Sequence, residues 1–236
     1  SKIEVKTKNE SFDYMINGWY LYQVISSRIL AKAGLYEVGG VSNYRDQLQD
    51  SMNICSVFAD LSRKQLLKSA MYQFEEGDVL HWWYEKNRFG LRSRHMDDHL
   101  WLVYATLHYL RVTDDTTILN EEIPYVVGDT LTEHEQERRI TFSFSSYSEP
   151  LLDHLLKSLS FSMSSIGCHN LPLIGEGDFC DSMNKIGIKG SGESVWLGFF
   201  LYQIISEFIS FMKNYDSNFD VNEYQVFNAK LKKALT

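Results

Sequence analysis

The sequence predicts an all-α fold. Apolar residues recur every three or four positions in successive segments, which is the period of a helix with one buried face. The chain has only three prolines, Pro124, Pro150 and Pro172, and each stands at a boundary of such segments. Strand-like runs are short and confined to places such as residues 79–83 and 140–144. These observations indicate helices joined by long functional loops.

The helices are predicted in order along the chain. The first covers residues 12–33 and is followed by Gly34, a residue that commonly ends helices. In the third helix, Ser62 and Gln65 have the spacing of an N-terminal capping pair. The remaining predicted helices cover residues 47–59, 62–74, 97–112, 149–164, 193–214 and 221–235.

The connections between the helices differ in length and composition. Those at 60–62 and 114–117 are short, whereas those at 39–45, 75–96 and 172–192 are long and rich in Gly, aromatic and charged residues. Helical hairpins arranged in a ring have this property, because each inner helix begins or ends at the same rim. The functional residues are therefore expected at one end of the helices.

Composition limits the classes of function. A chain of 236 residues with 44% apolar residues can bury a sizeable core. A net charge of -8 argues against nucleic acid as a partner, since duplex binding normally needs a basic surface. The longest apolar stretch, 195–209, is interrupted by polar residues and Gly198, so no membrane segment is expected.

Cysteine and histidine spacing predicts neither a disulfide framework nor a metal. Three cysteines without paired spacing favour a reducing compartment, here the cytoplasm. His95 and His99 are four residues apart, as in a zinc-binding helix. However, Met96 occupies the place of that motif's Glu, and His95 precedes the predicted helix.

An acidic loop at residues 177–181 is the strongest local indication of chemistry. Asp178 and Asp181 flank Phe179, and the loop contains no Lys or Arg. An aromatic face suits a pyranose ring, and a neighbouring carboxyl group can donate a proton to a glycosidic oxygen. The same composition is also typical of a solvated turn or a helix cap.

Five motifs in order resemble a known family, the inverting β-glycoside phosphorylases. This family includes cellobiose and chitobiose phosphorylases, β-1,2-oligoglucan phosphorylase and the phosphorylase domain of cyclic β-1,2-glucan synthase. The sequences at 45–50 and 81–83 are more similar to the β-1,2-glucan members. The motifs occupy residues 43–50, 73–83, 92–102, 177–184 and 192–198.

The resemblance implies an (α/α)6 barrel, of which residues 1–236 are a part, and phosphorolysis of β-glucosides to α-glucose 1-phosphate. The family's proton donor falls on Asp181. The resemblance implies inorganic phosphate as the co-substrate and no cofactor or metal. Because phosphate is already an anion, no carboxylate base is needed to activate it. The expected partners are an oligosaccharide, phosphate and a second copy of the chain, since relatives tend to be dimers.

The resemblance also implies ligands for the sugar and for phosphate. Asp46 would bind hydroxyls of the donor sugar with Arg45 beside it; without the resemblance, the two would be an ordinary surface ion pair. Lys32 lies near a phosphate-binding Arg of the family, although it also suits a solvated helix end.

Further candidates for substrate binding follow the same motifs. Gln49 and Asp50 line the pocket or cap a backbone turn. Trp83 is preferred over Trp101 for stacking on a sugar ring, although burial in the core is a common role for a Trp.

Two arginines and two aspartates complete the predicted set. Arg92, Arg94, Asp97 and Asp98 are expected to form a polar wall, in which one Asp caps its helix and the other faces the sugar.

The chain departs from the family at the acidic loop and in length. Phe179 replaces a Trp, Cys180 an Asn and Ser182 a Gly, which predicts an altered donor subsite. Twelve helices need roughly 300 residues, so an incomplete barrel is expected. The family's other phosphate ligands, a His and a Thr-Gly pair, lie in later helices. We therefore expect little or no phosphorolysis by the 236-residue chain alone.

Two other functions remain open. One is an inverting hydrolase on the same barrel, with Asp46 or Asp97 as the base. The other is a catalytically impaired carbohydrate-binding module, which the changes at Phe179 and Cys180 favour.

Overall fold

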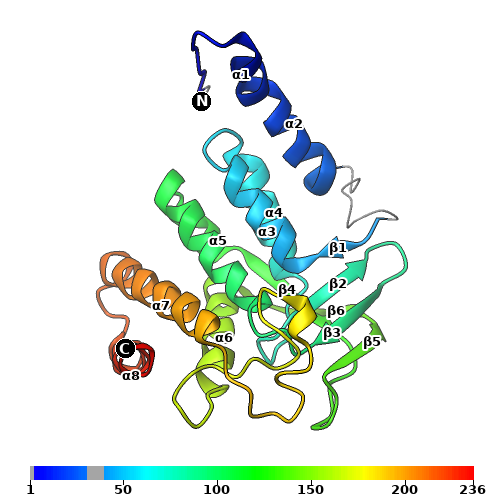
Figure 1. Ribbon diagram of the computed structural model, residues 1–236, viewed down its shortest axis with the longest axis vertical. Helices are drawn as coiled ribbons and strands as arrows, with labels where there is room; N and C mark the ends of the chain where they lie inside the picture. Colours follow the sequence, from blue (N-terminus) through cyan, green and yellow to red (C-terminus); the bar gives the residue numbers. More distant parts are fainter. Residues whose placement is uncertain (1–2, 31–39) are drawn as a thin grey trace.

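Helices form most of the framework (Figure 1). The computed structural model describes residues 3–30 and 40–236, so Lys32 and Gly34 lie outside the described residues. Residues 10–30 are helical throughout, as α1 (Glu10–Tyr14) and α2 (Tyr20–Val24), each followed by a π-helical segment. The other helices are α3 (Tyr44–Ile54), α4 (Ala59–Ala70), α5 (Asp98–Thr113), α6 (Leu151–Ser164), α7 (Val195–Tyr215) and α8 (Asn222–Leu235).

The helices pack in two rows. The first row is α2, α3, α5 and α7, in which each helix contacts the next (Figure 1). The second row packs against it: α4 contacts α3, α6 contacts α4 and α5, and α8 packs on α7. Consecutive helical hairpins in two rows are the arrangement expected of part of a helical ring. The helical framework is therefore confirmed, and the closed barrel stays a prediction.

The contacts between α3 and α4 correct one detail of the prediction. Ser62 and Gln65 do not cap α4, which begins three residues earlier than predicted, at Ala59. Instead, the Ser62 hydroxyl donates to the backbone oxygen of Ser51 at 2.6 Å. The Gln65 amide donates to Gln47 Oε1 at 2.7 Å. Both side chains are buried and connect the two helices.

Two antiparallel sheets accompany the helices, so the all-α prediction holds for the helical framework but not for the connections between the helices. The larger has the order β1-β2-β3-β5 and the smaller pairs β4 with β6. The predicted short strand runs are present, in β2 and around β5 and β6. β3 escaped detection because it contains Gly90 and Arg92, and the part of β6 after Phe144 did so because Ser residues dominate it. The strands are β1 (Ser42–Asn43), β2 (Leu80–Tyr84), β3 (Phe89–Ser93), β4 (Glu122–Val127), β5 (Glu137–Thr141) and β6 (Ser143–Pro150).

Trp83 lies in the core, which corrects its predicted role in sugar stacking. Its side chain is fully buried, with the ring stacked on Tyr72 at 4.0 Å between centroids and edge-on to Tyr44 at 6.2 Å. A β-bulge between Leu80 and Trp82 shifts the register of β2 against β3. Leu80 and Trp83 thereby face the core, while the half-buried His81 between them is left for the site.

Helix α7 is, by length and composition alone, the one described helix that could cross a membrane. In this structure its apolar residues have a different role. Leu201, Ile204 and Phe208 are buried in the core that α7 shares with α5 and α8. Packing within the molecule therefore accounts for the apolar face of the helix.

Replacing Trp83 by Ala is expected to destabilise the protein by about 3–5 kcal/mol, because it leaves a cavity among Tyr72, Tyr44 and the helices. Chemical denaturation measures the change. Phe199→Ala, at a side chain that is 55% exposed on α7, is the control and should cost less than about 1 kcal/mol. Loss of sugar binding by Trp83→Ala with unchanged stability would return Trp83 to the substrate site.

Candidate active site

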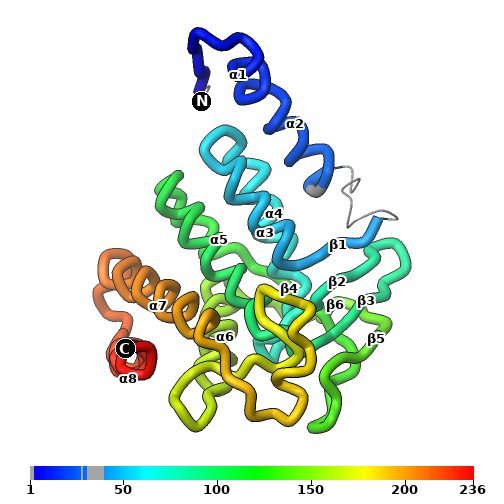
Figure 2. Tube along the Cα trace, viewed as in Figure 1, coloured from blue at the N-terminus to red at the C-terminus, as the bar shows by residue number. Residues whose placement is uncertain are grey.

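A pocket of about 380 Å³ lies where the first turn of α3 meets β2, the start of α5 and the loop before α7. Figure 2 shows this loop, residues 165–194, passing beneath the ends of the helices. Arg45, Asp46, Asp98 and Asp181 were predicted from the sequence, and the structure brings them together. The lining residues are Asn43, Tyr44, Arg45, Asp46, His81, Asp98 and Asp181.

Arg45 connects three parts of the chain. Its Nη1 donates to Asp97 Oδ2 at 3.0 Å and to the backbone oxygen of Asp178 at 3.1 Å, and its Nη2 donates to Asp181 Oδ1 at 2.8 Å. Although burial opposes the charge, Asp97 and Asp98 raise the pKa of Arg45. The guanidinium therefore stays a cation and holds the acidic loop against the start of α5.

Asp97 and Asp98 differ in their surroundings. Asp97 is fully buried and accepts from Arg45 and from Trp101 Nε1, and burial together with the neighbouring Asp98 raises the pKa of Asp97 to about 7. Burial also opposes the charge of Asp98, but His81, at 2.7 Å, lowers the pKa of Asp98 below its usual value. Asp98 lines the pocket as predicted. Asp97 makes no side-chain capping bond, contrary to the prediction that one of the pair would cap α5.

The two aspartates of the acidic loop have separate roles. Asp178 is buried, and its carboxylate accepts from the hydroxyl of Ser194 at 2.7 Å and from the backbone N–H of Cys180 at 3.1 Å. The same Ser194 hydroxyl accepts from the N–H of Leu197 and so caps α7. Asp181 starts a short 3-10 turn, and its side chain is 53% exposed at the pocket. Asp178 fixes the loop and Asp181 presents a carboxylate to a ligand.

Two histidines of the site were not predicted. The imidazole rings of His81 and His95 stack, with their centroids 4.0 Å apart and an angle of 7° between their planes. Against the effect of burial, Asp98 raises the pKa of His81, whereas burial and the neighbouring His81 lower the pKa of His95 to about 4. His81 lies in a motif that was noted for its tryptophans, and His95 lies two residues before Asp97, so closeness to these motifs in the sequence was the available signal.

Among residues 3–30 and 40–236, two groups have ligand atoms close enough for a metal: His81 with His95 and Asp98, and Cys168 with His169 and Glu193. The lone pairs of an imidazole lie in the plane of its ring. Because the rings of His81 and His95 are nearly parallel, one ion cannot lie in both planes. The second group is largely exposed and shares no residue with the lining of the pocket.

Several predicted ligands lie outside the lining of the pocket. Arg94 donates to the backbone oxygens of Glu135 and Thr132, and so fixes the loop before β5. Arg92 is buried and makes a bidentate pair with Asp78. Gln49 and Asp50 are half-buried on the next turn of α3. The predicted polar wall is thus divided between the pocket and structural contacts.

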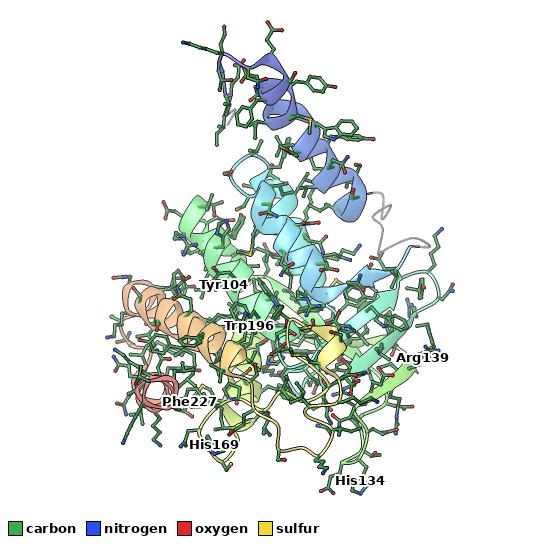
Figure 3. The ribbon with its side chains drawn as sticks, in the orientation of Figure 1. Tyr104, His134, Arg139, His169, Trp196 and Phe227 are labelled. Carbon is green, nitrogen blue, oxygen red and sulfur yellow. The ribbon has the colours of Figure 1, made fainter. Side chains whose placement is uncertain are left out.

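An aromatic surface adjoins the acidic loop. Phe179 is half-exposed and packs on Trp196, with 4.7 Å between ring centroids. Trp196 contacts Phe200, which in turn contacts Trp101. Figure 3 shows Trp196 at the start of α7, with Tyr104 on the neighbouring α5. Phe179 therefore keeps an open face beside the pocket, as the prediction of a substrate-binding aromatic requires.

A larger hollow of about 570 Å³ lies elsewhere, between the later turns of α5 and α7. Both apolar and polar residues line it, and none of the predicted site residues is among them. The smaller pocket at the acidic loop is the candidate active site because it gathers carboxylates, an arginine and a histidine.

Comparison with known proteins agrees with the five motifs. The catalytic domain of the glycosyl hydrolase 94 superfamily matches residues 1–236. Cyclic β-(1,2)-glucan synthase NdvB of Rhizobium meliloti (strain 1021) is 36% identical over 211 residues, which are 89% of this chain and 8% of that protein. The resemblance stated from the sequence is therefore confirmed.

Two phosphorylases are more distant relatives. Solabiose phosphorylase of Paenibacillus borealis is 28% identical over 87% of this chain and 23% of its own length. N,N'-diacetylchitobiose phosphorylase of Vibrio proteolyticus is 26% identical over 99% of this chain and 30% of its own length. The chain thus spans less than a third of each of these three relatives.

Asp97→Asn is expected to change how stability depends on pH. An Asp in an unfolded chain has a pKa of about 4, so the raised pKa of Asp97 makes the folded state bind more protons between about pH 4 and 7. The contribution of Asp97 to stability is therefore largest below pH 4 and declines up to pH 7. Asn does not titrate and shows no such decline. The free energy of unfolding of the variant should therefore rise relative to that of the wild type between pH 4 and 7, by about 1.4 kcal/mol per unit by which the pKa is raised.

Urea denaturation at pH 4, 5.5 and 7 measures this difference. Asp129→Asn, at a side chain that is 79% exposed, is the control and should run parallel to the wild type. A parallel curve for Asp97→Asn would contradict the protonation of Asp97 in this range.

Proposed function

Because the chain belongs to the glycosyl hydrolase 94 superfamily, we propose that its pocket serves the inverting phosphorolysis of β-glucosides, with β-1,2-linked gluco-oligosaccharides as substrates and α-glucose 1-phosphate as a product. The relatives named as phosphorylases support the reaction. The 36% identity to a cyclic β-(1,2)-glucan synthase supports the linkage. The proposal places residues 1–236 within one (α/α)6 barrel that the two rows of helices begin.

The position of Asp181 carries the proposal. It is an exposed carboxylate at the pocket, on a loop that Asp178 and Arg45 hold in place. In the reaction, the Asp181 carboxyl group donates its proton to the glycosidic oxygen while a phosphate oxygen attacks the anomeric carbon from the opposite face. Asp46 binds hydroxyls of the donor sugar, and Phe179 offers the face of its ring to a sugar.

The phosphate-binding site is the part of this proposal that the described pocket supports least. Arg45 is engaged by two carboxylates and a carbonyl oxygen, which leaves it little capacity for a second anion. We assign Lys32 to phosphate and place further ligands in those parts of the relatives that this chain does not span. Phosphate is the co-substrate, and the proposal includes no cofactor.

Hydrolysis on the same scaffold is the second candidate, because Asp46 also lines the pocket and is a carboxylate on a different element from Asp181. The two reactions differ in the nucleophile. A phosphorylase releases α-glucose 1-phosphate only when phosphate is supplied, whereas a hydrolase releases glucose without phosphate.

Asp181→Asn in the full-length protein is expected to abolish both phosphorolysis of sophoro-oligosaccharides and synthesis from α-glucose 1-phosphate. The side-chain amide of Asn is too weak an acid to protonate the glycosidic oxygen in place of a carboxyl group. A loss of at least about 100-fold is expected, measured as release of glucose 1-phosphate. Asp129→Asn, another Asp in a solvated loop, should keep wild-type rates.

Retained phosphorolysis in Asp181→Asn would remove this residue from its role. Turnover of the wild type without phosphate would favour the hydrolase. Sugar binding by calorimetry with no turnover under either condition would favour a binding module.

A further inference from the structure

We propose that His95 is a positioning residue for Asp181: its Nε2–H, together with Arg45, holds the Asp181 carboxylate that forms as the proton leaves. The inference deepens the proposed function and rests on it. His95 Nε2 lies 3.7 Å from Asp181 Oδ1, the same oxygen that Arg45 Nη2 contacts at 2.8 Å. A small rotation of the half-exposed Asp181 side chain brings the histidine within hydrogen-bonding distance.

Burial gives His95 Nε2 a need for such a partner. The side chain is only 6% exposed, and among the described residues Nε2 has no hydrogen-bond partner. A buried ring nitrogen without a partner carries an energetic cost unless a ligand or a moving group satisfies it. Asp181 Oδ1 is a carboxylate oxygen that lies 3.7 Å from this nitrogen.

Ser93 and Asp181 lie on opposite ring nitrogens of His95 and together bear on which nitrogen carries the hydrogen. The Ser93 hydroxyl oxygen accepts from the backbone N–H of His95 at 3.4 Å and lies 2.8 Å from His95 Nδ1. A carboxylate oxygen 3.7 Å from Nε2 favours a hydrogen on that nitrogen over a lone pair, so the proposal places the ring hydrogen on Nε2 and lets the Ser93 hydroxyl donate to Nδ1. Burial, with His81 nearby, lowers the pKa of His95 to about 4, so the ring is a neutral donor at neutral pH.

The backbone fixes the spacing between His95 and the acidic loop. The N–H of Met96 donates to the oxygen of Gly177 at 2.9 Å, and the N–H of Glu176 donates to the oxygen of Arg94 at 2.9 Å. A Cβ atom at position 177 would lie 3.2 Å from His95 Cδ2 and 3.3 Å from Nε2. Glycine at the start of the loop therefore makes room for the imidazole beside it.

The groups around Asp181 explain why a second donor matters. Arg45 and Asp46 face it from α3, His81 from β2, Asp98 from the start of α5 and His95 from the turn before that helix. His81 is already hydrogen-bonded to Asp98, and Arg45 divides its hydrogen bonds between Asp97 and Asp181. A further donor for the Asp181 carboxylate therefore has to come from His95.

During the reaction, the O–H bond of Asp181 breaks and an O–H bond forms on the leaving sugar. The bond between the anomeric carbon and the glycosidic oxygen breaks as phosphate binds that carbon. The negative charge left on Asp181 is then shared by Arg45 and His95.

The experiment compares His95→Phe with His95→Gln in the full-length protein. Phe keeps the stacking on His81 but removes the donor, whereas the amide nitrogen of Gln replaces Nε2. His95→Phe should lower kcat for phosphorolysis about tenfold and leave the KM for oligosaccharide within about twofold. Without the donor the protonated acid is favoured, so the alkaline limb of the kcat profile should move up by about one pH unit. His95→Gln should restore most of both.

Two further variants separate positioning from folding. Ser93→Ala releases the hydrogen from Nε2 without changing any group that faces the pocket, and should move the alkaline limb in the same direction by a smaller amount. His134→Gln, an exposed histidine in the loop before β5, should behave as wild type. The melting temperature of each variant shows whether it folds. If His95→Phe does not fold, Ser93→Ala and His95→Gln still test the inference.

An unchanged pH profile in His95→Phe, or in Ser93→Ala if the Phe variant does not fold, would overturn the inference. So would failure of His95→Gln to restore activity in a folded protein. Either result leaves the proposed function intact, because that depends on the loss of activity in Asp181→Asn.

Discussion

The whole site depends on the cost of burying charge without a counterion. Asp97 is fully buried, and Arg45 is its cationic partner, from a helix that lies 52 residues earlier in the sequence. The same guanidinium reaches Asp178 and Asp181, which are 133 and 136 residues further along than Arg45. Removing one member of a buried pair typically costs about 3–5 kcal/mol. The positions of α3, α5 and the acidic loop are therefore coupled through one side chain.

The direction of the helices explains why these charges can gather. The first turns of α3, α5 and α7 all lie at the end of the molecule where the pocket is found (Figure 1). Each helix presents unpaired N–H groups and the positive end of its dipole there. A cluster of carboxylates is more stable at such an end than at the opposite one. The sheets occur in the long connections at this same end and hold His81 and Arg94 in place.

The sequence predicted the helical framework and part of the site. Helical periodicity located α3 to α8 within a few residues, because each helix buries one face. The strands were largely missed, since β3 and β6 are stabilised by pairing with distant segments rather than by their own composition. Trp83 was misassigned because sequence alone does not show which side of a bulged strand faces the core.

Contacts between distant residues account for what sequence could not show in the site. The stacking of His81 on His95 depends on the bulge in β2 and on the turn before α5. The different roles of Asp178 and Asp181 depend on Ser194, which lies 16 residues after Asp178 and donates a hydrogen bond to it. The family motifs identified Arg45, Asp46 and Asp181 without these contacts, because the order and spacing of short segments is enough for recognition.

The hydroxyl of Ser194 limits which residues can occupy that position. Ser, Thr, Asn and Asp all begin helices well. Here, however, the same oxygen must accept from Leu197 and give a proton to the buried Asp178. An aspartate has no proton to give and would set two like charges together, and alanine would satisfy neither neighbour. Aspartate and alanine should consequently be disfavoured at this position, although the rules for starting a helix would permit aspartate.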